Sequence, residues 1–205
     1  METLTSAPID NYELIISLIK DDLVNSRLIH NLNSIGIDAN NYNLNLRMAI
    51  LKLMGFQSVS DSIHDQYYEF TLRSKDIDFV ADPQLLNPLV QEIYRFLNGL
   101  DRKTMQTRMP LVINKTIITD LIRQDLINYS MIHSLGNIQI NAEDYLLDIG
   151  RIVFEIMDIE SREDVETIFE QYSKMSEQVL SMQVSQSSAD IKRLAGEIYG
   201  YLEGK

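Results

Sequence analysis

The feature that most constrains this chain is an internal repeat, because its two halves carry one residue pattern at a spacing of 103. Segment 118–145 is identical to segment 15–42 at 13 of 28 positions, and most of the remaining positions hold conservative exchanges. After two inserted residues the spacing becomes 105, which aligns Asp65-Gln66-Tyr67 with Glu170-Gln171-Tyr172. A period of this length predicts one structural unit written twice.

Apolar residues recur at helical spacing in four segments of each half. Only four Pro and eight Gly occur in 205 residues, which also favours long helices over short strands and tight turns. The sequence therefore predicts an all-α protein of two four-helix units, which form either tandem bundles or one pseudo-twofold eight-helix domain. The expected helices are 10–34, 41–56, 59–79, 83–98, 114–136, 142–158, 162–184 and 188–203.

The predicted divisions of the chain are a first helical repeat over 1–100, a linker over 101–112 and a second repeat over 113–205. Within the repeats, Asp82 and Ser187 are expected to cap the last helix of each unit at its N-terminus. Gly99 and Gly204 are expected to follow those helices as C-terminal caps.

Composition excludes several classes of function. The formal net charge is −12, and an acidic surface repels both nucleic-acid phosphates and anionic membrane surfaces. The absence of Cys excludes disulfides, thiolate metal sites and a cysteine nucleophile. No apolar run approaches the roughly 20 residues needed to span a bilayer, and the first residues lack the pattern of a secretory signal. The expectation is a soluble cytoplasmic protein that binds neither nucleic acid nor membrane.

Two aspartates of the repeat, Asp22 and Asp125, fall on the apolar stripe of the first helix of each unit. A buried carboxylate is costly without a partner, so each is expected to have one. Two such polar networks could line a ligand cavity. The alternative, which we favour, makes them polar specificity elements or places them at the solvent margin. The candidate partners are Asn25 and Asn128 one turn later, and Tyr94 and Tyr199 on the last helix of each unit.

His30 and His133 also occupy equivalent positions of the repeat, and a repeated histidine is a candidate general base or metal ligand. Neither has a second histidine or a carboxylate three or four residues further on, which favours helix-end histidines that interact with nearby carbonyls or the helix dipole. The Glu-x-x-His motif of di-metal bundles and the Gly-rich loops of phosphate sites are both missing. We therefore expect no metal, no cofactor and no identifiable catalytic residue.

Two classes of function remain. The first is a non-enzymatic interaction or regulatory protein built from a duplicated helical unit, with a protein as its partner. The second is a small-molecule-binding protein or enzyme with a pocket near the repeated Asp, Asn, His and Tyr positions. The sequence favours the first class and leaves the oligomeric state open.

Overall fold

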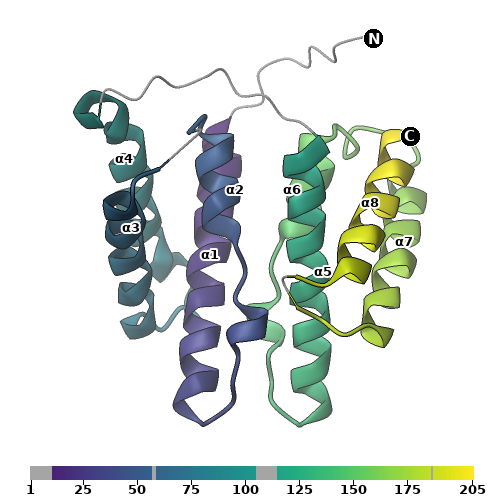
Figure 1. Cartoon of the computed structure of the whole chain (residues 1–205), viewed down its shortest axis with the longest axis horizontal. Coiled ribbons are helices and arrows are strands. Elements are labelled where there is room, and N and C mark those ends of the chain that lie inside the picture. Colours follow the sequence, from purple (N-terminus) through teal and green to yellow (C-terminus); the bar gives the residue numbers. More distant parts are fainter. Residues whose placement is uncertain (1–10, 57–58, 105–114, 186) are drawn as a thin grey trace.

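The computed structural model describes residues 11–56, 59–104, 115–185 and 187–205, and this part of the chain is all-helical, without strands (Figure 1). This confirms the predicted all-α class. The helices are α1 (Asn11–Ser34), α2 (Leu46–Leu53), α3 (Asp61–Arg73), α4 (Asn87–Thr104), α5 (Lys115–Asn137), α6 (Ile149–Ile156), α7 (Val165–Ser176) and α8 (Ala189–Glu203). Short 3-10 turns are η1 (Asn40–Tyr42), η2 (Ser74–Asp76), η3 (Pro83–Leu86), η4 (Glu143–Tyr145) and η5 (Glu177–Ser181).

The helices α2 and α6 are shorter than the predicted spans 41–56 and 142–158. Each predicted span begins instead with a 3-10 turn, η1 or η4, which an extended segment connects to the α-helix. Side chains of the preceding long helices bind the backbone of these segments, so their peptide groups are satisfied without a helical turn. The spans predicted for α3 and α7 likewise end in 3-10 turns, η2 and η5.

The caps are partly as predicted. Asp82 accepts a hydrogen bond from the Gln84 backbone at 2.9 Å, and Gly204 follows α8. The cap at Gly99 is wrong, because α4 continues to Thr104 and buries Leu100 in the core. The start of the predicted linker is thus helical, and residues 105–112 lie outside the described part. Ser188, not Ser187, caps α8.

The two halves of the chain share their core. The helices α1, α2, α5 and α6 stand in the middle, with α3 and α4 on one side and α7 and α8 on the other (Figure 1). The helix α2 packs on α5, and α1 contacts α6. One apolar cluster runs through both halves, from Leu14 to Leu202. A smaller one joins the ends of α1 and α5.

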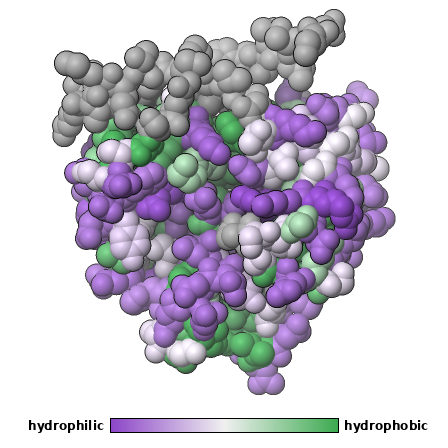
Figure 2. Space-filling model, viewed as in Figure 1, coloured by the Kyte–Doolittle hydropathy of each residue, from purple (hydrophilic) through white to green (hydrophobic). Residues whose placement is uncertain are grey.

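Hydrogen bonds also cross between the halves. The Asn45 backbone donates to Gln124 Oε1 on α5 at 2.8 Å, and Asn31 Nδ2 on α1 donates to the Tyr145 hydroxyl at 3.0 Å. The visible surface is mostly hydrophilic, with apolar residues gathered at the end where α1 and α5 finish (Figure 2). No described helix has both the length and the apolar character required to cross a bilayer.

Candidate functional site

Two buried asparagines of the long helices, Asn25 and Asn128, position the segments that precede α2 and α6. Asn25 Oδ1 accepts from the Leu44 backbone at 3.0 Å, and its Nδ2 donates to the Tyr42 carbonyl at 3.4 Å. Asn128 makes the same two bonds with backbone groups 103 residues further on, at 3.1 and 3.3 Å. The asparagines therefore bind backbone and are not the partners of the neighbouring aspartates.

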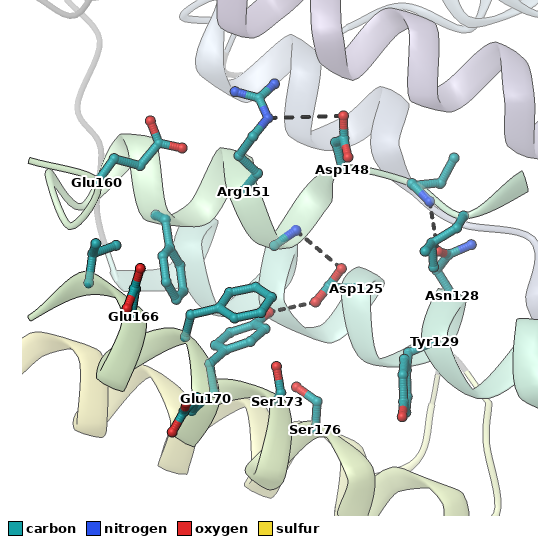
Figure 3. A pocket seen from close by; sticks show the side chains of 17 residues that line it. Asp125, Asn128, Tyr129, Asp148, Arg151, Glu160, Glu166, Glu170, Ser173 and Ser176 are labelled. Atoms are coloured by element: carbon teal, nitrogen blue, oxygen red, sulfur yellow. Dashed lines mark hydrogen bonds and ion pairs between the residues drawn. The ribbon is translucent and has the colours of Figure 1, made fainter. Parts of the chain in front are cut away.

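Asp125 joins three helices. Its Oδ2 accepts a hydrogen bond from the Tyr172 hydroxyl on α7 at 2.6 Å, and its Oδ1 accepts from the Gly150 backbone on α6 at 3.1 Å (Figure 3). The partners expected from the sequence, Asn128 and Tyr199, are wrong. The sequence placed the hydrogen-bond partner of Asp125 on its own helix or on α8. The structure instead has donors from α6 and α7.

Asp22 has a different environment in the first half. Burial raises the pKa of Asp22 from 3.8 to about 6, although the fully buried Tyr67 and the charge of Arg47 on α2 lower it. The Tyr67 hydroxyl does not reach hydrogen-bond geometry with any described atom. The Arg47 guanidinium lies 5.7 Å from the centre of the Tyr67 ring and donates to the His64 carbonyl at 3.3 Å. Among the described residues no ion pair joins Arg47 to Asp22, so Arg47 is a nearby charge.

The position that corresponds to Arg47, 103 residues later, is Gly150. A Cβ atom there would lie 3.1 Å from Asp125 Oδ2 and 3.5 Å from Cε1 of Tyr172. The lack of a side chain lets Asp125 and Tyr172 approach the α6 backbone closely. These two side chains therefore occupy the position toward which a Cβ at Gly150 would point, and Gly150 also lines a cleft.

A cleft of about 700 Å³ opens at this place, between α5, α6, α7 and the segment that leads into α6 (Figure 3). This volume lies in the range of sites for small molecules. Phe154 packs edge-on against both Phe169 and Tyr172, with ring centres 6.2 and 5.3 Å apart. The apolar side chains that line the cleft are Leu146, Leu147, Phe154, Val165 and Phe169.

The polar lining of the cleft is mostly acidic. Three exposed glutamates, Glu160, Glu166 and Glu170, line it together with Asp125 and Asp148. Its single lining cation is Arg151, which is engaged in ion pairs with Asp148 at 4.0 Å and Glu155 at 3.4 Å. Among the described residues, no Lys or Arg forms an ion pair with Asp125. The buried hydroxyl of Ser176, also in the lining, makes no hydrogen bond with any described atom.

Burial raises the pKa of Asp125 from 3.8 to about 6, although the Tyr172 hydroxyl and the Gly150 N–H lower it. The charge of Asp148 adds to the increase. Burial and the Asp125 charge raise the pKa of Tyr172 well above 10. At neutral pH the site therefore holds an ionised carboxylate and a protonated phenol. The carboxylate is hydrogen-bonded, and within the described ranges no Lys or Arg forms an ion pair with it.

The other candidate residues lie elsewhere. His30 and His133 are exposed on α1 and α5, and His133 Nδ1 is 3.2 Å from Asn137 Nδ2. Tyr94 packs edge-on against Tyr12, with ring centres 4.9 Å apart. The Tyr199 hydroxyl donates to Glu203 at 2.9 Å. None of these four lines the cleft, and no group of three or more acidic or histidine side chains in the described ranges is arranged to hold a metal ion.

Sequence reasoning missed the two residues that define the site, Tyr172 and Gly150. Tyr172 aligns with Tyr67 in the repeat, but Tyr94 and Tyr199 were the candidate tyrosine partners predicted from the sequence. Gly150 stands opposite Arg47 in the alignment of the halves, and this difference was the available signal. The first half has a long cationic side chain near the repeated aspartate, and the second half has none. This difference indicates that Asp125 lacks a nearby cation or that the helices pack differently around it.

No protein-family model, no curated protein and no solved structure matches this chain, so its residues and their geometry are the basis for any function assigned to it.

Proposed function

We propose that this protein binds a small molecule in the cleft between α5, α6 and α7. The observation that carries the proposal is the 700 Å³ apolar cleft that has the Asp125 carboxylate in its lining. Ligand sites combine apolar walls with a few polar groups that orient the ligand. Asp125, held by Tyr172 and Gly150, is such a group.

The lining favours binding over catalysis. Ser173 and Ser176 are in the cleft, but a serine nucleophile requires a general base, and none of the three histidines lines it. The Tyr172 phenol, with its raised pKa, stays protonated and is a hydrogen-bond donor to Asp125. We therefore assign the cleft a binding role.

We infer further that the protein is a duplicated helical unit whose two copies are fused around a pseudo-twofold axis. The small core cluster supports this, because its buried members form pairs 103 residues apart: Leu28 and Met131, Leu32 and Leu135, Ala39 and Ala142. The positive φ angles support it too, since Gly36 (83°) and Gly55 (86°) have counterparts at Gln139 (63°) and Asp158 (54°). On this inference, the ligand site belongs to one copy only, because Arg47 occupies the corresponding space of the other.

A fragment screen followed by ¹⁵N amide shift mapping tests the binding role. Bound fragments are expected to shift the amides of Gly150 and Leu147, whose N–H groups bond to lining residues. Ser173→Phe fills the cleft and should abolish binding. Gln171→Phe adds the same ring to an exposed position of α7 outside the lining and should leave binding intact. Hits that map elsewhere, or that survive Ser173→Phe, contradict the proposal.

A second candidate function is the interaction or regulatory role with a protein partner. It is favoured by Ile35 and Ile138, which are 65% and 58% exposed just beyond α1 and α5, at the same end of the molecule. Exposed branched side chains of this kind mark contact surfaces more often when they lie together. Affinity capture with the wild-type protein and with Ile35→Ser/Ile138→Ser tests it. A specific partner should be lost with the double variant.

A further inference from the structure

We propose that the ligand of the cleft is an organic cation whose charged group is a guanidinium, held by Asp125 in the half of the chain that has Gly150 in place of Arg47. This inference rests on the proposed function, since it names the ligand class of the same cleft. Three sets of observations lead to it: the contacts of Arg47, the charge balance of the cleft, and the chemistry of its walls.

Arg47 indicates which charged group lies near this kind of site. In the first half an aspartate of the long helix, a buried tyrosine and a guanidinium are neighbours, with Arg47 5.7 Å from the Tyr67 ring centre. Burial raises the pKa of Asp22 and the Arg47 charge lowers it, although no ion pair joins the two among the described residues. The second half repeats the aspartate and the tyrosine as Asp125 and Tyr172, but it has Gly150 in place of the arginine. The second half therefore has no guanidinium at this position, and Gly150 lines the cleft.

The charges of the cleft point in the same direction. Asp125 has two hydrogen-bond donors and no ion pair among the described residues, and further carboxylates line the cleft. Arg151 is already shared between Asp148 and Glu155. A buried carboxylate is stabilised strongly by a nearby cation in a low-dielectric site. An anionic ligand would meet repulsion here, and a neutral one would leave Asp125 unbalanced.

The walls suit a flat cation with an apolar body. Phe154, Phe169 and Tyr172 present aromatic rings, and a guanidinium stacks well on such rings. Its five N–H donors match the remaining lone pairs of the Asp125 carboxylate. Leu146 and Leu147 offer contacts to an alkyl chain. The guanidinium could belong to a free alkylguanidine or to an arginine side chain of a peptide.

The test compares n-butylguanidinium with n-butylurea, its uncharged isostere, by ¹⁵N shift titration of the full chain at pH 7.5. We expect n-butylguanidinium to bind at least about tenfold more tightly, which corresponds to 1.4 kcal/mol. Asp125→Asn should remove this preference but keep the weak binding of n-butylurea. Asp120→Asn removes an acid of the same helix outside the cleft, and it should keep the preference. Gly150→Arg should abolish binding of n-butylguanidinium.

The outcomes separate this inference from the proposed function. If n-butylurea binds in the cleft as tightly as n-butylguanidinium, the cleft is a ligand site and the cation inference is wrong. If neither probe binds at millimolar concentration, both fall. If Gly150→Arg does not fold, the cation inference is still tested by two results. These are the preference of the wild-type protein for n-butylguanidinium and the loss of this preference in Asp125→Asn. A Gly-Gly-Arg-Gly peptide that binds more tightly than n-butylguanidinium identifies a peptide as the source, and one that binds more weakly identifies a free small molecule.

Discussion

Removal of the hydroxyl should lower the free energy of unfolding more at Tyr172 than at Tyr67, although both tyrosines lie beside a buried aspartate. Tyr172 donates to the Asp125 carboxylate at 2.6 Å, whereas the buried Tyr67 hydroxyl has no hydrogen bond with a described atom. A hydrogen bond to a charged group contributes about 1.5–3 kcal/mol. Tyr172→Phe should therefore lower the free energy of unfolding at pH 8 by about 2 kcal/mol. Tyr67→Phe should lower it by less, about 0.5 kcal/mol, because the Tyr67 hydroxyl lowers the pKa of Asp22 without reaching hydrogen-bond geometry.

The loss in Tyr172→Phe should depend on pH. The hydroxyl lowers the pKa of Asp125, so it stabilises the ionised form, and this stabilisation is present above pH 6 and decreases as Asp125 takes up its proton. At pH 5 the loss should shrink to the value of a neutral hydrogen bond, about 1 kcal/mol.

Urea unfolding followed by circular dichroism measures both effects. At a slope of about 2 kcal/mol/M, a loss of 2 kcal/mol moves the midpoint by about 1 M, with the slope unchanged. Tyr67→Phe is the matched control, since it removes the same atom from the corresponding position. Equal losses in the two variants, or a loss in Tyr172→Phe that is the same at pH 5 and pH 8, would refute the assignment of the carboxylate–phenol bond.

Three further predictions concern stability and assembly. Burial and the charges of two other aspartates raise the pKa of Asp21 from 3.8 to about 8. Between these values the folded state holds a proton that the unfolded chain releases. The free energy of unfolding should therefore fall as pH rises from about 4 to 8. Asp21→Gln, which copies Gln124 of the second half, should weaken this dependence and increase the free energy of unfolding at pH 9, measured by urea titration. Gln139→Gly should stabilise the fold by about 0.5–1 kcal/mol, because φ is 63° there, and Gly36→Gln should destabilise it by a similar amount in the same assay. Finally, two fragments cut between α4 and α5 should associate when co-expressed and stay unfolded when separate, as judged by size-exclusion chromatography and circular dichroism, because they share one core.

The helices were predictable because apolar spacing determines them directly. The eight predicted spans each contain one of the described α-helices or most of it, and the position of Asp125 on an inward face followed from the same pattern. The residues at which α2 and α6 begin were not predictable in this way. They depend on hydrogen bonds from Asn25 and Asn128 to backbone groups 17 and 19 residues away, and helix periodicity carries no information on such contacts.

The site itself depended on tertiary geometry. Whether Asp125 meets a tyrosine of α7 or of α8 is decided by how the helices rotate about their axes, and both helices carry a tyrosine on an apolar face. The cleft is lined by residues of α5, α6, α7 and the segment that leads into α6, and their packing against one another cannot be read from helix periodicity.

The core that runs from Leu14 to Leu202 means that the chain should melt in a single transition rather than half by half. If a ligand binds the cleft of the second half in the native state only, its binding free energy stabilises the whole cooperative unit, including the first half. A probe on α3, on the opposite side of the molecule from α7 (Figure 1), would report saturation through the melting temperature. Hydrogen exchange should likewise slow in helices that never touch the bound molecule.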